Sequence, residues 1–139
     1  MIKKINIDDL ITFNNIGVQV NNNFLALFNL KDIINSDYEY VFGYYIDNKL
    51  VGFIHISKLY ENVDIINIVV DSSYRKQGIG SKLLNFIISL FDDCKTILLE
   101  VNENNKDAID LYKRNNFKVI NIRTKYYGND NALIMKRDV

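Results

Sequence analysis

The spacing of apolar positions changes several times along this chain and divides it into helices and strands. Apolar residues recurring at helical spacing predict helices over 8–16, 22–35, 78–91 and 104–115. Alternating or unbroken apolar runs predict strands, and these cover 3–7, 38–46, 50–59, 65–70, 96–101, 117–126 and 132–136. The order is β-α-α-β-β-β-α-β-α-β-β, which is typical of an α/β fold with a mixed sheet.

Local signals refine three of these elements. Asp47 and Asn48 form a turn pair between two alternating segments, so 38–46 and 50–59 are expected to form a hairpin. Asp8 is expected to cap the first helix, and Asn104 or Asn105 to cap the helix that ends near 115. We expect residues 1–139 to form a single domain.

At the centre of this order lies a strand–loop–helix–strand crossover over residues 65–101. The strand 96–101 is almost continuously apolar, as expected of a parallel strand that is covered on both faces. Two parallel strands that splay apart leave a cleft at their carboxyl ends, where such folds bind ligands.

Composition excludes several classes of protein. The 17 basic and 17 acidic side chains leave no positive surplus, so we expect no nucleic-acid partner. No apolar run approaches the roughly 20 residues of a membrane span, and no signal peptide is recognisable, so we expect a cytoplasmic protein without a membrane partner. The single cysteine, Cys94, cannot form an internal disulfide or a thiolate metal site, which fits a reducing compartment and no metal.

The strongest local motif is the loop Arg75-Lys76-Gln77-Gly78-Ile79-Gly80, which follows an apolar strand and opens an amphipathic helix. Free N–H groups at a helix start, approached closely through glycines, form an anion site. The loop is neither a nucleotide P-loop, because no Gly-Lys-Ser/Thr closes it, nor a dinucleotide fingerprint, because the third glycine is missing. Basic residues also outnumber acidic ones after residue 65, which suits a phosphate-bearing ligand.

This loop in this context resembles the acetyl-coenzyme A motif of the GNAT superfamily of N-acetyltransferases, and the element order resembles that fold over essentially the whole chain. The resemblance implies a mostly antiparallel central sheet with one parallel pair splayed at the cofactor cleft. Further matching segments are Ile68 to Asp71 with Tyr74, Leu99 to Val101, Asn105, Ala108, and Leu111-Tyr112.

The C-terminal segment resembles one subfamily, which acetylates the N-terminal alanine of a small-subunit ribosomal protein. The matching residues are Asn116-Phe117, Arg123, Tyr126-Tyr127 and Ala132 to Met135. Residues 17–36 lack the aromatic substrate-loop signature of that subfamily. Ser72 and Ser73 stand where it usually has proline, and Asn116 where it has glycine, with asparagine the second choice for a left-handed helix stop.

The resemblance implies acetyl-CoA as cosubstrate and assigns the residues of its site. The cofactor-binding set is Ile68, Val69, Val70, Arg75, Lys76, Gln77, Gly78, Ile79, Gly80, Ser81 and Asn105. Tyr126 and Tyr127 are expected to wall the amine entrance, although ordinary strand aromatics would look the same. Asn105 can equally serve as a helix cap alone.

The chemistry of the reaction points to further groups. The acceptor amine must attack in its neutral form, so a carboxylate acting through water can serve as base. Glu100 interrupts an otherwise apolar strand and is our candidate; the alternative is a strand-end ion pair with an arginine or lysine. Tyr112 is the candidate acid for the leaving thiolate, against a packed core tyrosine. A backbone N–H near Val69 or Val70 is expected to hold the oxyanion, if a bulge frees it from the sheet.

His55 and Cys94 are not expected to act in catalysis. His55 lies in an alternating strand and reads as a structural or solvent-facing histidine. Cys94 follows Asp92 and Asp93, which disfavour its thiolate.

Three functions remain open from the sequence. They are an acetyl-CoA-dependent N-acetyltransferase acting on a peptide N-terminus, the same chemistry on a small amine such as a polyamine or an antibiotic, and a coenzyme A-binding module without catalysis. The C-terminal segment favours the first, with the N-terminal alanine of a ribosomal protein as acceptor.

Overall fold

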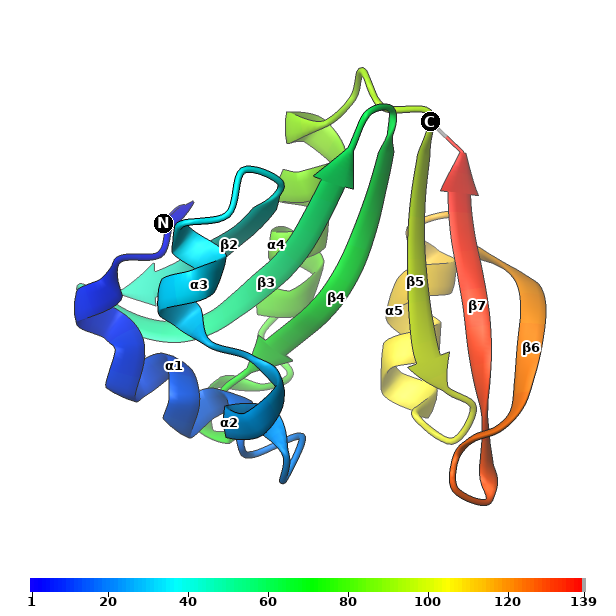
Figure 1. Ribbon diagram of the computed structural model, residues 1–139, viewed down its shortest axis with the longest axis horizontal. Helices are drawn as coiled ribbons and strands as arrows, with labels where there is room; N and C mark the ends of the chain where they lie inside the picture. Colours follow the sequence, from blue (N-terminus) through cyan, green and yellow to red (C-terminus); the bar gives the residue numbers. More distant parts are fainter. Residues whose placement is uncertain (139) are drawn as a thin grey trace.

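The computed structural model describes residues 1–138, apart from the side chain of Tyr127, and is organised around one seven-stranded sheet (Figure 1). The strand order is β1-β2-β3-β4-β5-β7-β6, and every neighbouring pair is antiparallel except β4 and β5. The strands are β1 (Ile2–Lys4), β2 (Glu39–Ile46), β3 (Lys49–Leu59), β4 (Asn62–Val70), β5 (Thr96–Asn102), β6 (Lys118–Tyr127) and β7 (Asp130–Asp138). The helices are α1 (Leu10–Gly17), α2 (Phe24–Leu27), α3 (Leu30–Ile34), α4 (Ile79–Leu90) and α5 (Lys106–Arg114), with 3-10 turns at Ile7–Asp9 and Ser72–Tyr74.

Helices cover both faces of the sheet and create two apolar cores. On one face α4 and α5 bury a cluster that includes Ile54, Leu83 and Leu99. On the other face α1, α2 and α3 pack their apolar residues on β2 and β3 around Phe13 and Phe53. None of the helices within residues 1–138 is long and apolar enough to cross a membrane.

The β2–β3 hairpin confirms the turn expected at Asp47 and Asn48. Ile46 pairs with Lys49, so these two residues alone form the loop. Their φ angles are 50° and 64°, and positive φ at both central residues is the requirement of a type I′ turn.

The parallel pair separates after four residue pairs, as expected from the sequence. β4 and β5 pair from Asn62↔Thr96 to Ile65↔Leu99, and beyond that point they diverge (Figure 1). The register of β4 against β3 shifts there, because Ile56 faces Ile65 while His55 faces Asn67, which makes Ile66 a bulged residue. A bulge bends its strand, so this extra residue turns the end of β4 away from β5.

The prediction of a single helix over 22–35 is wrong. Two short helices form instead, separated by Phe28 in an extended conformation with φ −131° and ψ 117°. The side chain of Asn29 then starts α3 by accepting a hydrogen bond from the N–H of Asp32 at 3.1 Å. Leu25 and Leu27 supported the long helix by their spacing, yet both are about 60% exposed.

Smaller differences concern element boundaries. The first strand ends at Lys4, and Asn6 rather than Asp8 provides the first cap, accepting from the N–H of Asp8 at 2.9 Å. β4 begins three residues before the expected start, at Asn62. Asn116 follows α5 with φ 69°, the left-handed conformation expected of a helix stop.

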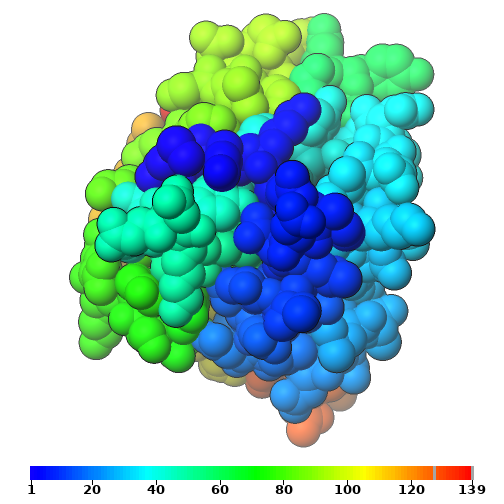
Figure 2. Space-filling view, turned by 90° about the vertical axis from the view of Figure 1, so that its left-hand side faces the viewer, coloured from blue at the N-terminus to red at the C-terminus, as the bar shows by residue number. Residues whose placement is uncertain are grey.

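The N-terminal helices also reach the loop that precedes α4. The side chain of Gln19, just after α1, accepts a hydrogen bond from the N–H of Ser72 at 2.9 Å. Figure 2 shows the N-terminal segment spread over this flank beside the residues of that loop. Segments on both sides of the sheet thus meet just after the carboxyl end of β4.

Candidate active site

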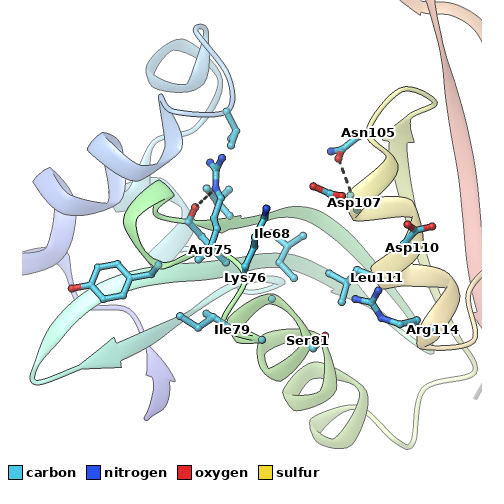
Figure 3. Close-up of a pocket in the computed structure, with 17 residues that line it drawn as sticks. Ile68, Arg75, Lys76, Ile79, Ser81, Asn105, Asp107, Asp110, Leu111 and Arg114 are labelled. Atoms are coloured by element: carbon cyan, nitrogen blue, oxygen red, sulfur yellow. Dashed lines mark hydrogen bonds between the residues drawn. The ribbon is translucent and has the colours of Figure 1, made fainter.

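A cavity of about 490 Å³ opens where β4 separates from β5, between the N-terminus of α4 and the side of α5 (Figure 3). Its walls are formed by Val20, Ile68, Val69, Val70, Tyr74, Arg75, Lys76, Gly78, Ile79, Gly80, Ser81, Asn105, Asp107, Ala108, Asp110, Leu111 and Arg114. The lining combines apolar residues of β4 with charged residues of the loop before α4 and of α5.

The start of α4 offers backbone donors to this cavity. The first hydrogen bond within the helix runs from the N–H of Lys82 to the carbonyl of Gly78 at 3.0 Å, so the N–H groups of residues 79–81 have no acceptor inside the helix. Gly78 has a φ of 80°, and a Cβ there would meet nothing within 4 Å, so the backbone angle rather than crowding calls for glycine. At Gly80 a Cβ would lie 3.4 Å from Leu111, so a small residue lets α4 and α5 approach closely.

Positively charged side chains lie beside these donors. Arg75 folds back over β4, where its Nε donates to the carbonyl of Val70 at 3.1 Å. Lys76 on the loop and Arg114 on α5 also line the cavity, while Asp107 and Asp110 are its acidic members. Backbone N–H groups, a helix N-terminus and three cations together favour a phosphate-bearing ligand.

The exposed edge of β4 provides a second set of backbone groups. Asp71 donates its N–H to the carbonyl of Val51 at 2.8 Å, which directs the polar groups of Asp71 and Val69 toward β3. Successive residues of a strand alternate, so the N–H groups of Ile68 and Val70 point toward the gap. The geometry therefore favours Val70 over Val69 as the donor to an oxyanion.

The cavity gathers the expected cofactor residues except Gln77, which is exposed on the loop. Asn105 lines the cavity and also caps α5, accepting from the N–H of Ala108 at 3.3 Å. Sequence reasoning missed Val20, Asp107, Asp110 and Arg114. The three α5 residues follow one another at helical spacing, so the face of α5 that looks onto the cavity was a detectable signal.

Glu100 lies outside this cavity. Leu99 and Val101 are buried on the side of α4 and α5, so strand alternation places Glu100 on the opposite face of the sheet. Its Oε1 lies 3.2 Å from Nη2 of Arg123 on β6, with β7 between the two strands. The guanidinium of Arg123 in turn lies 5.5 Å from the centre of the Tyr126 ring. The ion pair weighed in the sequence analysis is thus present, and it joins the candidate base to a candidate substrate wall.

Tyr112 is buried on α5, with 5% of its surface exposed, and its ring lies 5.8 Å from that of Phe117. It does not line the cavity, so its role as an acid stays a prediction. The side chain of Tyr127 lies outside the described part of the chain, and its predicted contact with substrate is not tested.

His55 is buried, so the solvent-facing alternative is wrong. Its exposed fraction is 1%, and its Nε2 lies 3.0 Å from Oε1 of Glu39. Burial lowers the pKa of His55 below its usual 6.5, and the charge and hydrogen bond of Glu39 oppose that shift. Cys94 is also buried, and burial together with Asp93 raises the pKa of its thiol, as expected.

Comparison with known proteins identifies the family. The profile of the Acetyltransferase (GNAT) family matches residues 11–117. The chain belongs to the GNAT family. The sequence-based assignment to this family and its fold is confirmed, and GNAT acetyltransferases are enzymes that use acetyl-CoA.

Among curated GNAT relatives, the ribosomal protein bS18-alanine N-acetyltransferase of Escherichia coli strain K12 is 33% identical over 95 residues. The aligned stretch spans 64% of this chain and 64% of that enzyme. An N-alpha-acetyltransferase of Sulfolobus acidocaldarius is also 33% identical, over 85 residues that cover 58% of this chain and 51% of the relative.

Solved GNAT structures share the whole fold. The ribosomal-protein-S18-alanine N-acetyltransferase from Escherichia coli superimposes with a TM-score of 0.86 and 26% identity, covering 100% of this chain and 93% of that one. A GNAT family acetyltransferase from Elizabethkingia anophelis with acetyl-CoA bound gives a TM-score of 0.83 at 15% identity, covering 100% and 97%. The second likeness is one of fold alone.

Proposed function

We propose that this GNAT protein transfers the acetyl group of acetyl-CoA to the α-amino group of a protein N-terminus in the cytoplasm, with the N-terminal alanine of a ribosomal protein as the favoured acceptor. The observation that carries the proposal is the cavity at the separated β4–β5 pair, where the open start of α4 and the free edge of β4 face one ligand. The similarity to bS18-alanine N-acetyltransferase supports the choice of acceptor.

The residues of the cavity fit acetyl-CoA, whose thioester supplies an activated acetyl group. The N–H groups of residues 79–81, with Arg75 and Lys76, suit its pyrophosphate. The N–H group of Ile68 suits the amide-rich pantetheine arm, because an open strand edge hydrogen-bonds such chains. In this arrangement Val70 is the backbone donor that holds the oxyanion formed at the acetyl carbon.

The acceptor amine loses a proton before it attacks. An α-amino group has a pKa of about 7.7–8.0 and a lysine side chain about 10.4, so a neutral N-terminus is far easier to obtain near neutral pH. Glu100 takes this proton through a water, while Arg123 holds one oxygen of the carboxylate in place. Tyr112 gives a proton to the thiolate that leaves, the nitrogen loses its second proton to solvent as the amide forms, and Tyr112 regains a proton from solvent.

The charges near Glu100 favour a single amine over a polycation. Arg123 pairs with Glu100, and Lys125 follows on the same strand, so the positive charge of these two residues opposes the approach of a polyamine to Glu100. Tyr126 is 52% exposed beside Arg123 and offers an aromatic surface to an incoming peptide. These features suit one α-amino group presented on an extended chain.

Thiol release from acetyl-CoA over a panel of acceptors tests this function. The panel contains a peptide with a free alanine N-terminus, the same peptide blocked at its N-terminus but containing lysine, and spermidine. We expect the free alanine peptide to react fastest by at least tenfold. Faster acetylation of spermidine or of the blocked peptide would contradict the acceptor, and binding of acetyl-CoA without transfer to any amine would contradict the enzyme.

A further inference from the structure

A partly buried histidine–carboxylate hydrogen bond on the opposite face of the sheet from α4 has no role in the acetyl transfer proposed above. His55 on β3 lies with Nε2 3.0 Å from Oε1 of Glu39 on β2, and the two side chains are 1% and 24% exposed. A carboxylate can only accept, so Nε2 carries the proton and donates it to Glu39. Nδ1 of His55 then presents a lone pair to its surroundings.

Asn67 faces His55 across the β3–β4 ladder. His55 and Asn67 are partners in the β3–β4 register, next to the bulged residue Ile66. Nδ1 of His55 and Nδ2 of Asn67 are both buried, and neither has a hydrogen-bond partner among the described residues. Buried polar atoms are nearly always paired, because leaving one unsatisfied costs its full desolvation penalty. One atom is an acceptor and the other a donor, so a single water between them satisfies both.

The position of Asn67 connects this pair to the reaction site. Asn67 lies beyond the last β4–β5 pair, Ile65↔Leu99, and directly precedes Ile68, which lines the cofactor cavity. Strand alternation places Asn67 and Glu100 on the same face of the sheet as His55. The polar side chains of Glu39, His55, Asn67 and Glu100 therefore form a row across this face, from β2 to β5, near the place where β4 and β5 separate.

We propose that Glu39, His55 and Asn67 form a second proton-accepting site for the acceptor amine, through a water held between His55 Nδ1 and Asn67 Nδ2. This inference rests on the proposed acetyl transfer. The water takes a proton from the ammonium group of the acceptor and gives one of its own to Nδ1. The amine keeps the lone pair that forms the new C–N bond, and its nitrogen loses a second proton to solvent as the C–S bond breaks and the thiolate takes the proton of Tyr112. Glu39 stabilises the imidazolium until its proton passes through the same water to solvent, from which Tyr112 is reprotonated.

The surrounding charges agree with this role. Glu39 on β2, Asp64 on β4 and Glu100 on β5 are the acidic groups that strand alternation places on this face near the pair, and α2 contributes the edge-on ring of Phe28 at 5.7 Å from the imidazole. Burial keeps His55 neutral near pH 7, so Nδ1 is available to accept a proton.

The protonation of His55 can be read directly, because it is the single histidine of the chain. In protein labelled with ¹⁵N-histidine, we expect one ring nitrogen to carry hydrogen, Nε2, and Nδ1 to show the shift of an unprotonated, hydrogen-bonded nitrogen at pH 7. Hydrogen on Nδ1 instead of Nε2 would overturn the proposal regardless of any activity measurement.

Kinetics test the transfer itself. Glu39→Gln keeps the size and the hydrogen bond of residue 39 but removes the charge that stabilises imidazolium, and Asn67→Leu removes the donor that holds the water. Each is expected to lower kcat about tenfold at pH 7, with partial recovery at pH 9 as the amine deprotonates by itself. Glu61→Gln is the matched control, because Glu61 is exposed and pairs only with Lys95 at the far end of β4 within the described residues.

The outcomes separate this inference from the proposed function. Losses in Glu39→Gln and Asn67→Leu that do not change with pH, or that fall below twofold of the Glu61→Gln control, indicate a structural role and overturn the relay. A wild-type protein that binds acetyl-CoA but acetylates no amine instead contradicts the proposed function. The thermal shift caused by acetyl-CoA should be equal in all four proteins, because none of these residues lines the cavity.

Discussion

The two sides of the gap between β4 and β5 are built by different means. On the proposed cofactor side, backbone groups from one continuous stretch, residues 68–81, provide most of the donors, and α5 closes the cavity. On the proposed acceptor side, isolated side chains meet from distant strands, as when Arg123 reaches Glu100 across β7. Recognition by backbone depends on conformation and survives many sequence changes, whereas recognition by side chains changes with single substitutions. A shared cofactor and divergent acceptors are the expected consequence for such a family.

The largest effect should come from the acceptor side. Glu100→Gln is expected to lower kcat about 100-fold at pH 7, because the amine loses its base, with partial recovery as pH rises toward the pKa of the amine. Acetyl-CoA affinity should stay within twofold, since Glu100 lies outside the cavity. A pH-rate profile and a cofactor titration of the same variant check both statements. A loss of less than threefold would return Glu100 to a purely structural ion pair.

Acetyl-CoA binding should be weakened by backbone strain at the start of α4 rather than by the loss of a side chain. Gly78→Val places a β-branched residue at φ 80°, which costs about 1–2 kcal/mol or more and distorts the start of α4. We expect acetyl-CoA affinity to fall about 10- to 30-fold by calorimetry. Gly128→Val is the matched control, because Gly128 also has positive φ, 69°, and open space around it but lies in the β6–β7 turn. Equal losses of affinity in the two variants would contradict the assignment of the loop.

A smaller effect is expected at Arg123, which contacts both Glu100, the proposed base, and Tyr126, the proposed wall of the acceptor site. Arg123→Ala is expected to lower kcat about fivefold and to raise the KM of the acceptor, because Glu100 and Tyr126 both lose a partner. Unfolding stability should change little, since partly exposed ion pairs contribute about 0.2–1 kcal/mol. Arg123→Lys should restore part of kcat. If Arg123→Ala has the same effect in the Glu100→Gln background as in wild type, Arg123 does not act through Glu100.

Sequence reasoning recovered the parts of the molecule that depend on neighbouring residues. The Asp47-Asn48 turn and the glycine loop follow from short patterns, and the structure contains both. A bulge near Val69 or Val70 was only a condition for an oxyanion donor, and the bulge lies at Ile66 instead. The cap at Asn105 is of the same kind, because an N-cap is settled within three residues.

The features that the sequence predicted wrongly, or did not predict, depend on contacts between distant parts of the chain. Leu25 and Leu27 have helical spacing, but the helix is interrupted at Phe28, whose ring packs against His55 and Phe24. Glu39 and His55 lie on different strands, as do Glu100 and Arg123, so no pattern of neighbouring residues predicts either pair. The buried position of His55 could not be read from its alternating strand, because alternation does not tell which face is covered by helices.

The short parallel ladder also bears on how the protein is made. β4 and β5 are separated by an entire helix, and β5 takes its other partner, β7, from the last part of the chain described. The strands β1 to β4 can pair as their residues leave the ribosome, because each follows its neighbour closely except for the helical segment after β1. The gap at the end of β4 has no second wall until β5 is secured by β7. The half-sheet of β1 to β4 therefore has no second wall for a cofactor until β7 holds β5 in place, so the cleft depends on the pairing of the strands that come last along the chain.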